Sequence, residues 1–182
     1  MARPRLAVLA AALLFSTSAL ATVVLSLTME ELTARAPLVV HATAQRSLVA
    51  WDEPHAKIWT WTELVVKETL KGTPTETVLV KQPGGVVGEV GQQVSGVATF
   101  KPGEEVVLFL EPAPDEPGAF VPVSMSASKV TLEERFGAQV AKRDLSGLAF
   151  ATPGEQRVRE PDREVLGTAD AFLARIKAAV KR

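Results

Sequence analysis

The segment Ile58–Gly72, IWTWTELVVKETLKG, alternates between two kinds of residue and constrains the fold most. One side carries Ile58, Thr60, Thr62, Leu64, Val66 and Leu70, and the other carries Trp59, Trp61, Glu63, Val65 and Lys67. Such alternation is typical of a half-buried β-strand. Because Glu63 and Lys67 would be costly to bury, we expect the first side to face the core. Trp59 and Trp61 then lie outside that core, side by side on the strand surface.

Several other segments have the same strand character. Leu38–Trp51 alternates, and its pattern predicts a buried face made of Leu38, Val40, Ala42, Ala44 and Leu48. Val106–Leu110 is apolar on both sides, which indicates a central strand covered on each face. Further strands are expected at Glu76–Gln82, Ala119–Leu132 and Ala138–Leu145, with a hairpin turn at Glu133–Gly137.

Helix signals occur near both ends of this strand-rich region. Thr28 and Glu31 have the spacing of a capping box, which predicts a short helix over about Met29–Ala36. Thr168 can cap a second, amphipathic helix over 168–182, in which Phe172, Ile176 and Val180 recur every four residues. The charged, proline-containing stretch 152–167 is expected to be a surface loop.

These elements predict a mainly β fold: a small antiparallel OB-like barrel with a short N-terminal helix and a C-terminal amphipathic helix. The barrel domain is expected over 22–151, and the C-terminal helix over 168–182 is expected to pack on it. The apolar stripe of that helix needs a partner surface. Either the exposed side of Val106–Leu110 or the face that carries Trp59 and Trp61 could supply one.

The first 21 residues have the pattern of a signal peptide. Arg3 and Arg5 precede the apolar run Leu6–Phe15, and Ala19-Leu20-Ala21 is an A-x-A cleavage pattern. We therefore expect an exported protein, periplasmic or secreted, with no stable membrane span after cleavage; an uncleaved anchor is the alternative. Cleavage leaves 161 of the 182 residues and a formal charge of −3 in place of −1. No basic field then remains, so we expect no nucleic-acid partner.

The chain contains no cysteine, although exported proteins often carry disulfides. Lipid attachment to a thiol, thiol catalysis and thiolate metal sites are all excluded on this ground. The apolar core must hold the fold without covalent cross-links, which a domain of this size can do.

Five motifs together resemble a widespread, largely uncharacterised exported bacterial domain. They are LTARAPLVVHATA, TWTELVVKETLKG, the V-x-V-x-Q-P-G-G segment at Val78–Gly85, FKPGEEVVLFL and KRDLSGLAF, and the resemblance covers roughly Glu30–Leu148. In outline the chain is also similar to the OB-like barrel of the netrin module and of tissue inhibitors of metalloproteinases. The resemblance implies a five-stranded barrel. It does not imply protease inhibition, because those inhibitors reach the protease zinc through an N-terminal cysteine that this chain lacks.

Candidate chemistry in the sequence is sparse, and we expect no enzyme, no cofactor and no metal. His41 and His55 are the only histidines, and Asp52 and Glu53 beside His55 are too few ligands for a metal site. Ser146 lacks the glycine of a G-x-S-x-G nucleophile motif. The adjacent pair Glu104 and Glu105 would point to opposite sides of a strand.

Two features suggest binding. One is the pair of indoles, Trp59 and Trp61. The other is the glycine-rich segment Gly84–Gly96, expected to be a hairpin loop, which lacks the Lys and Ser/Thr of a phosphate loop. Tryptophan is enriched at binding hot spots, and loops on a rigid barrel often bind ligands. We therefore predict an exported, non-catalytic interaction module of the bacterial envelope or extracellular space that binds a protein partner. The alternatives are a carrier of a lipid or glycan in the barrel mouth and an enzyme with an unrecognised site. The candidate binding residues are Trp59, Trp61, Gly84, Gly85, Gly88 and Gly91.

Overall fold

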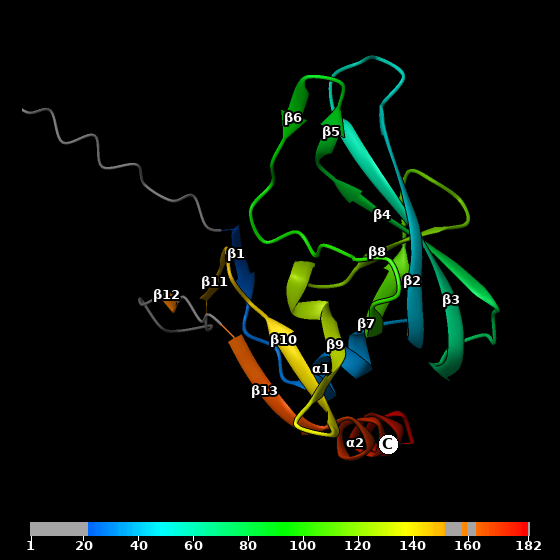
Figure 1. Ribbon diagram of the computed structural model, residues 1–182, viewed down its shortest axis with the longest axis vertical. Coiled ribbons are helices and arrows are strands. Elements are labelled where there is room, and N and C mark those ends of the chain that lie inside the picture. Colours follow the sequence, from blue (N-terminus) through cyan, green and yellow to red (C-terminus); the bar gives the residue numbers. More distant parts are fainter. Residues whose placement is uncertain (1–21, 152–157, 160–162, 182) are drawn as a thin grey trace, which may run out of the picture.

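The computed structural model describes residues 22–151, 158–159 and 163–181 (Figure 1). The expected signal peptide and most of the stretch 152–162 lie outside these residues. The described chain is mainly β, with a short N-terminal helix and a C-terminal helix. The elements of the first half are β1 (Thr22–Leu25), α1 (Met29–Arg35), β2 (Leu38–Trp51), β3 (Ile58–Lys71), β4 (Thr77–Pro83), β5 (Gly85–Val87) and β6 (Val90–Gln92). The elements of the second half are β7 (Glu105–Pro112), β8 (Ala119–Pro122), the 3₁₀ turn η1 (Met125–Ser128), β9 (Lys129–Arg135), β10 (Ala138–Asp144), β11 (Leu148–Ala151), β12 (Val158–Arg159), β13 (Arg163–Thr168) and α2 (Ala169–Val180).

Eight strands form one curved sheet in the order β13-β10-β9-β7-β2-β3-β4-β8. Most neighbours are antiparallel, as expected, but β4 pairs with β8 in parallel. Because β8 also pairs with β7, the strands follow a barrel-like ring. These pairings are short, so the ring is not closed along its height (Figure 1).

The central strand β7 is buried on both faces, as its apolar sequence predicts. Val107 and Phe109 pack beneath the two helices, whereas Val106, Leu108 and Leu110 pack inside the ring. All five side chains are fully buried. One strand therefore separates two apolar clusters, and each cluster removes several large side chains from water at roughly 1.5–3 kcal/mol apiece.

Both helix caps form as predicted. The Thr28 side chain accepts a hydrogen bond from the Glu31 backbone N–H, and the Glu31 carboxylate accepts one from the Thr28 N–H at 2.8 Å. The Thr168 hydroxyl accepts a hydrogen bond from the N–H of Ala171. These contacts satisfy backbone donors that the first turn of a helix leaves free.

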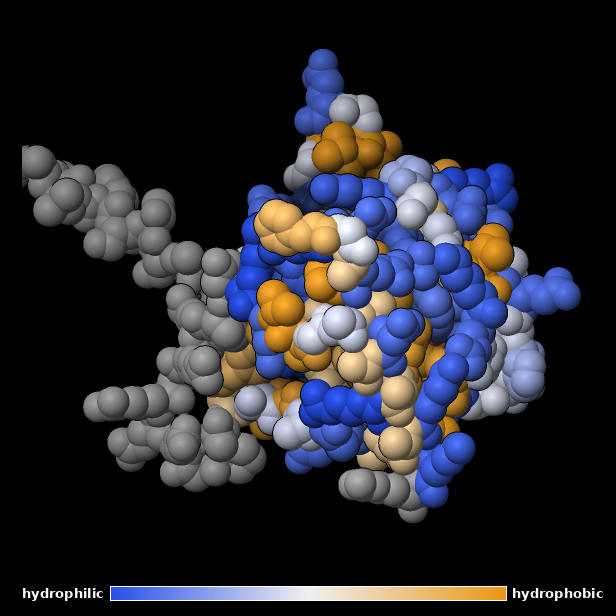
Figure 2. All heavy atoms as spheres, turned by 60° about the horizontal axis from the view of Figure 1, so that its bottom comes forward, coloured by the Kyte–Doolittle hydropathy of each residue, from blue (hydrophilic) through white to orange (hydrophobic). Residues whose placement is uncertain are grey.

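The C-terminal helix packs on the barrel but does not lie over the indoles. Phe172 and Ile176 are buried with α1 and with the outer residues of β7, β9 and β10. The helix meets β3 near Leu70, at the end of that strand opposite Trp59. Figure 2 shows the end of the molecule that carries α2, where apolar residues lie among hydrophilic ones. Of the helices in the described residues, none is both long and apolar enough to cross a bilayer.

The expectation of a loop over 152–167 is wrong where the structure describes that stretch. Residues 163–167 belong to β13, which pairs antiparallel with β10. Val158 and Arg159 form the short strand β12 beside β11. Prolines and charges suggested a loop, but an exposed edge strand also tolerates charged residues, because one of its sides faces water.

The predicted inward face of β2 is right only up to Ala44. The pairing register between β2 and β3 shifts between Ala44 and Arg46, so Gln45 has no residue opposite it. This β-bulge reverses the alternation. Leu48, expected in the core, is 66% exposed and pairs with Trp61, and Ser47 takes the inner side in its place.

Candidate functional site

A hollow of about 790 Å³ lies inside the upper part of the ring. The inner faces of β2, β3 and β4 form one wall, and the segment from Gly84 to Phe100 encloses the other side. Figure 1 shows this segment running from the β5–β6 hairpin back toward β7. We call this space the upper hollow. In a small barrel such a mouth is a common place for ligands.

The strand wall of the upper hollow carries four polar, uncharged side chains beside Pro83. They are Ser47, Thr60, Thr62 and Gln82. The hydroxyls of Ser47 and Thr62 lie 2.9 Å apart, and the Thr60 hydroxyl donates to the Gly84 carbonyl at 2.6 Å. The threonine side of β3 thus points inward as predicted, but beside Thr60 it lines a hollow and not a filled core.

The glycine-rich segment Gly84–Gly96 contains the hairpin of β5 and β6, which packs on the inner wall. Gly85 has φ +135°, and a Cβ atom there would meet Val49 Cγ1 at 2.4 Å and Thr60 Oγ1 at 2.8 Å. Gly84 has φ +101°, and a Cβ atom there would lie 2.9 Å from the Gln92 carbonyl oxygen. Only glycine allows the backbone to approach its neighbours this closely.

Three of the four candidate glycines line the upper hollow: Gly84, Gly85 and Gly91. Gly88 does not. It is the first residue of the two-residue turn between β5 and β6, with φ +60°, and a Cβ atom added there would meet nothing within 4 Å. A positive φ at this position is typical of a type II′ hairpin turn, so the role of Gly88 is to shape the hairpin.

The indoles lie on the opposite face of the same strands. Across the sheet, Leu48 pairs with Trp61 and Trp61 pairs with Lys81, which forms one outer row. Lys81 Nζ lies 4.4 Å from the ring centroid of Trp59 and 5.8 Å from that of Trp61. The structure therefore separates the two features that the sequence suggested as one binding region: glycines inside, tryptophans outside.

Lys81 is held between the indoles and the loop that joins β7 to β8. Its ammonium group donates to Asp115 Oδ2 at 2.8 Å and lies 3.1 Å from Glu116 Oε2. Trp61 Nε1 donates to both carboxylate oxygens of Glu116, at 3.0 and 2.9 Å. Burial alone would lower the pKa of Lys81, but the hydrogen bonds to Asp115 and Glu116 outweigh it and raise the pKa above its usual value. Sequence analysis missed Lys81, although its place opposite Trp61 follows once the register of β3 and β4 is known.

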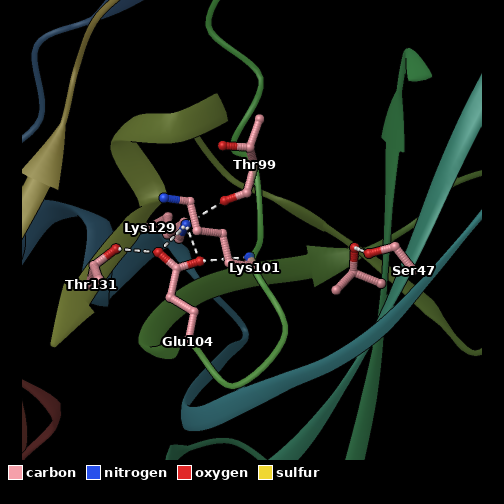
Figure 3. A network of polar contacts seen from close by, with 7 residues as sticks. Ser47, Thr99, Lys101, Glu104, Lys129 and Thr131 are labelled. Atoms are coloured by element: carbon pink, nitrogen blue, oxygen red, sulfur yellow. Dashed lines mark hydrogen bonds and ion pairs between the residues drawn. The ribbon is translucent and has the colours of Figure 1, made fainter. Parts of the chain in front are cut away.

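A second, smaller hollow of about 240 Å³ is rich in charge. At its centre Lys129 donates to both oxygens of Glu104, at 2.9 and 2.8 Å, and to the carbonyl of Thr99 (Figure 3). The hydroxyl of Thr131 and the backbone N–H of Lys101 also donate to Glu104. Burial lowers the pKa of Lys129, against the hydrogen bond from its ammonium group to Glu104. The Glu104 carboxylate and the Thr99 carbonyl hold the ammonium group in place.

In the described residues, the hydroxyls beside this charged network contact carboxylates and no histidine. Ser126 lines the smaller hollow, but its Oγ is buried and finds no hydrogen-bond partner among the described residues. The Ser146 hydroxyl donates to Asp144 at 2.6 Å, and no histidine completes a triad with this pair in the described residues. A nucleophilic serine needs a base within hydrogen-bond reach. The charged groups are joined instead by ion pairs, Lys129 with Glu104 and Lys142 with Glu133.

The two histidines lie at different ends of β2. His41 Nε2 lies 2.6 Å from Glu105 Oε1, and Lys67 lies 2.6 Å from the other oxygen of that carboxylate. His55 is in the turn after β2, stacked on Trp51 with ring centroids 6.1 Å apart. Within the described ranges, no group of three or more His, Asp or Glu residues is arranged to hold a metal ion. As predicted, Glu104 and Glu105 point to different sides and reach different partners.

Comparison of the chain with protein-family models and with curated protein sequences finds no match.

Proposed function

We propose that this chain is an exported, non-catalytic interaction module of the bacterial envelope or extracellular space, and that it binds a protein partner in the upper hollow. One observation carries the proposal: in the described part of the chain, no ionisable side chain lines this hollow of about 790 Å³. General acid–base and nucleophilic catalysis need groups that gain or lose a proton. A hollow lined by hydroxyls, amides, glycines and apolar groups suits holding a ligand and not transforming it.

The lining also favours a polypeptide as the ligand. Ser47, Thr60, Thr62 and Gln82 offer neutral donors and acceptors, as a peptide backbone requires. The glycines of the opposite side leave backbone groups unshielded by side chains. The apolar residues Val94, Val97 and Phe100 complete the lining and can contact apolar side chains of a partner.

An uncharged glycan is a second candidate, favoured by the size of the upper hollow. Its volume falls within the range of about 300–1,000 Å³ that is common for small-molecule sites. Sugar hydroxyls also pair well with Ser, Thr and Gln side chains. A lipid is less suitable, because the hydroxyl-rich wall would lose hydrogen bonds to water against an acyl chain.

A pull-down with the immobilised mature 161-residue form, exposed to its native envelope fraction, tests the proposal. The wild type is compared with Gly91→Phe and Gly91→Ala. Gly91 lines the upper hollow, and a Cβ atom there lies at an ordinary 3.7 Å from Val86 Cγ2. Both variants should fold, but only phenylalanine fills the space. We expect a discrete protein to be retained by the wild type and Gly91→Ala and lost with Gly91→Phe.

Retention of the same protein by Gly91→Phe would contradict the use of the upper hollow. Calorimetric titration with neutral oligosaccharides, using the same two variants, tests the second candidate. Saccharide binding that disappears only in Gly91→Phe, with no protein captured, would replace the protein partner by a glycan.

A further inference from the structure

Along the second half of β2, from Arg46 to Trp51, the described part of the chain places a strand beside one edge only. β7 pairs with β2 only over Leu38–Thr43, whereas β3 accompanies β2 up to Trp51. From Arg46 to Trp51, no strand of the described residues pairs with the second edge. Figure 1 shows this part of β2 rising well above β7. An edge of this kind is a template for another extended chain.

The hydrogen-bond pattern shows which backbone groups point to this edge. The N–H of Asp52 donates to the Lys57 carbonyl, across the hairpin toward β3. Backbone groups alternate along an antiparallel strand, so Ala50 and Leu48 also face β3. Ser47 and Val49 therefore direct their N–H and C=O groups to the open edge, where no strand of the described residues pairs with them.

The open edge borders the upper hollow. Ser47 lines the hollow through its hydroxyl, which lies 2.9 Å from that of Thr62, and yet it is an exposed residue. The hollow thus reaches solvent at this edge. A strand added beside Ser47 and Val49 would place every second side chain over the hollow, because side chains alternate between the two faces of a sheet.

We propose that the edge of β2 from Arg46 to Trp51 binds an extended segment of the protein partner by β-strand addition, a mode that rests on the proposed function. Backbone hydrogen bonds to Ser47 and Val49 supply the pairing, as in other complexes formed by strand addition. The side chains that enter the upper hollow are uncharged, because a charge there would lose its hydration without gaining a partner. On the outer face, exposed Leu48 contacts apolar side chains of the segment.

Ser47→Pro and Ser47→Ala form the matched pair for the test. Proline removes the open-edge N–H of Ser47 but no hydrogen bond to β3, since edge strands tolerate proline where the donor faces solvent. Alanine removes only the hydroxyl. The probe is a synthetic octapeptide, the tightest binder selected from a displayed random library on the wild-type mature form.

We expect the octapeptide to carry uncharged residues at alternate positions. Its affinity should fall at least tenfold with Ser47→Pro, the equivalent of about one lost hydrogen bond, and clearly less with Ser47→Ala, which removes one lining hydroxyl and keeps the backbone N–H. Hydrogen exchange on the unaltered protein should show that the peptide protects the amides of Ser47 and Val49. This measurement decides the matter even if Ser47→Pro fails to fold.

Three outcomes would overturn strand addition. They are equal affinity in the two Ser47 variants, protection elsewhere than on the β2 edge, and the absence of any peptide that binds. A dimer of the chain that is lost only in Ser47→Pro would assign the edge to a second copy. In each case, retention of an envelope protein that depends on Gly91 would leave the proposed function intact, so the two claims fail separately.

Discussion

Lys81 Nζ lies 4.4 Å from the centre of the Trp59 ring, on the outer face of the strands whose inner face lines the upper hollow. The indoles shield the ammonium group from water, and the carboxylates of Asp115 and Glu116 stabilise its positive charge. The polar groups of the face that resembled a recognition patch therefore already have partners within the chain, in the β7–β8 loop. The inner face keeps uncharged polar groups directed at the upper hollow.

Lys81→Leu should lower the free energy of unfolding by about 1–2 kcal/mol, because it removes the cation–π contact and the charged hydrogen bonds together. Denaturant unfolding measures the change. The control is Lys57→Leu, at an exposed lysine whose side chain makes no ion pair in the described residues; it should change stability by less than about 0.5 kcal/mol. Equal effects in the two variants would contradict the structural role of Lys81.

The ion pair of Lys129 and Glu104 should behave as a unit. Lys129→Met alone leaves a largely buried carboxylate without its cation, and we expect a loss of about 3 kcal/mol. The double variant with Glu104→Met should be more stable than the sum of the single changes predicts, because it leaves no unpaired charge. Additive effects in a double-mutant cycle would show that the two groups do not interact.

Gly85→Ala should be more damaging than Gly118→Ala. Both glycines have positive φ, +135° and +91°, so both substitutions strain the backbone by roughly 1–3 kcal/mol. Only at Gly85 would the new methyl also collide with the inner wall, at Val49 and Thr60. Thermal unfolding should show the larger loss for Gly85→Ala. Similar melting temperatures would mean that the hairpin does not pack on the wall.

Stability should fall in acid partly because of Glu105. Burial alone would raise its pKa, but the hydrogen bonds from Lys67 and His41 outweigh burial and hold the pKa below its usual value of 4.5. A lowered carboxylate pKa stabilises the fold above the unfolded value, and this contribution is lost as pH falls through the folded one. Glu105→Gln should be less stable than the wild type at pH 7 and approach it below pH 4.5.

Denaturant unfolding of both proteins across pH measures this convergence. The control is Glu89→Gln, at an exposed residue of the β5–β6 turn, which should follow the wild type at every pH. A constant gap between Glu105→Gln and the wild type down to acidic pH would exclude the proposed linkage.

The local sequence pattern predicted strand limits and buried faces correctly where side-chain alternation within one strand is sufficient to determine them. The limits of β2 and β3, the two burial faces of β7 and both helix caps follow from alternation and from short-range hydrogen bonds. The separation of Trp59 and Trp61 from Thr60 and Thr62 was predicted for the same reason. The threonines were themselves a signal of the upper hollow, since polar residues on an inner face need space or partners.

Long-range pairing decided the rest. Leu48 and Ser47 lie on the opposite faces from those predicted, because the bulge at Gln45 reverses the alternation of β2. Whether that bulge forms depends on how β2 pairs with both β3 and β7. Residues 163–168 became a strand only because β10 lay beside them, and the glycine segment became a hairpin only against the wall of β2 and β3.

The sequence by itself determined the class of fold, since side-chain alternation and capping act within a few residues. Only the tertiary structure decided that the C-terminal helix packs near Leu70, at the end of β3 far from the indoles. It also decided that Lys81 and Glu116 contact the indole rings, and that the polar inner face borders the open edge of β2. Strand register, the packing of the helix and the enclosure of the upper hollow all depend on contacts between residues far apart in the chain. Local preferences do not determine which of these residues meet.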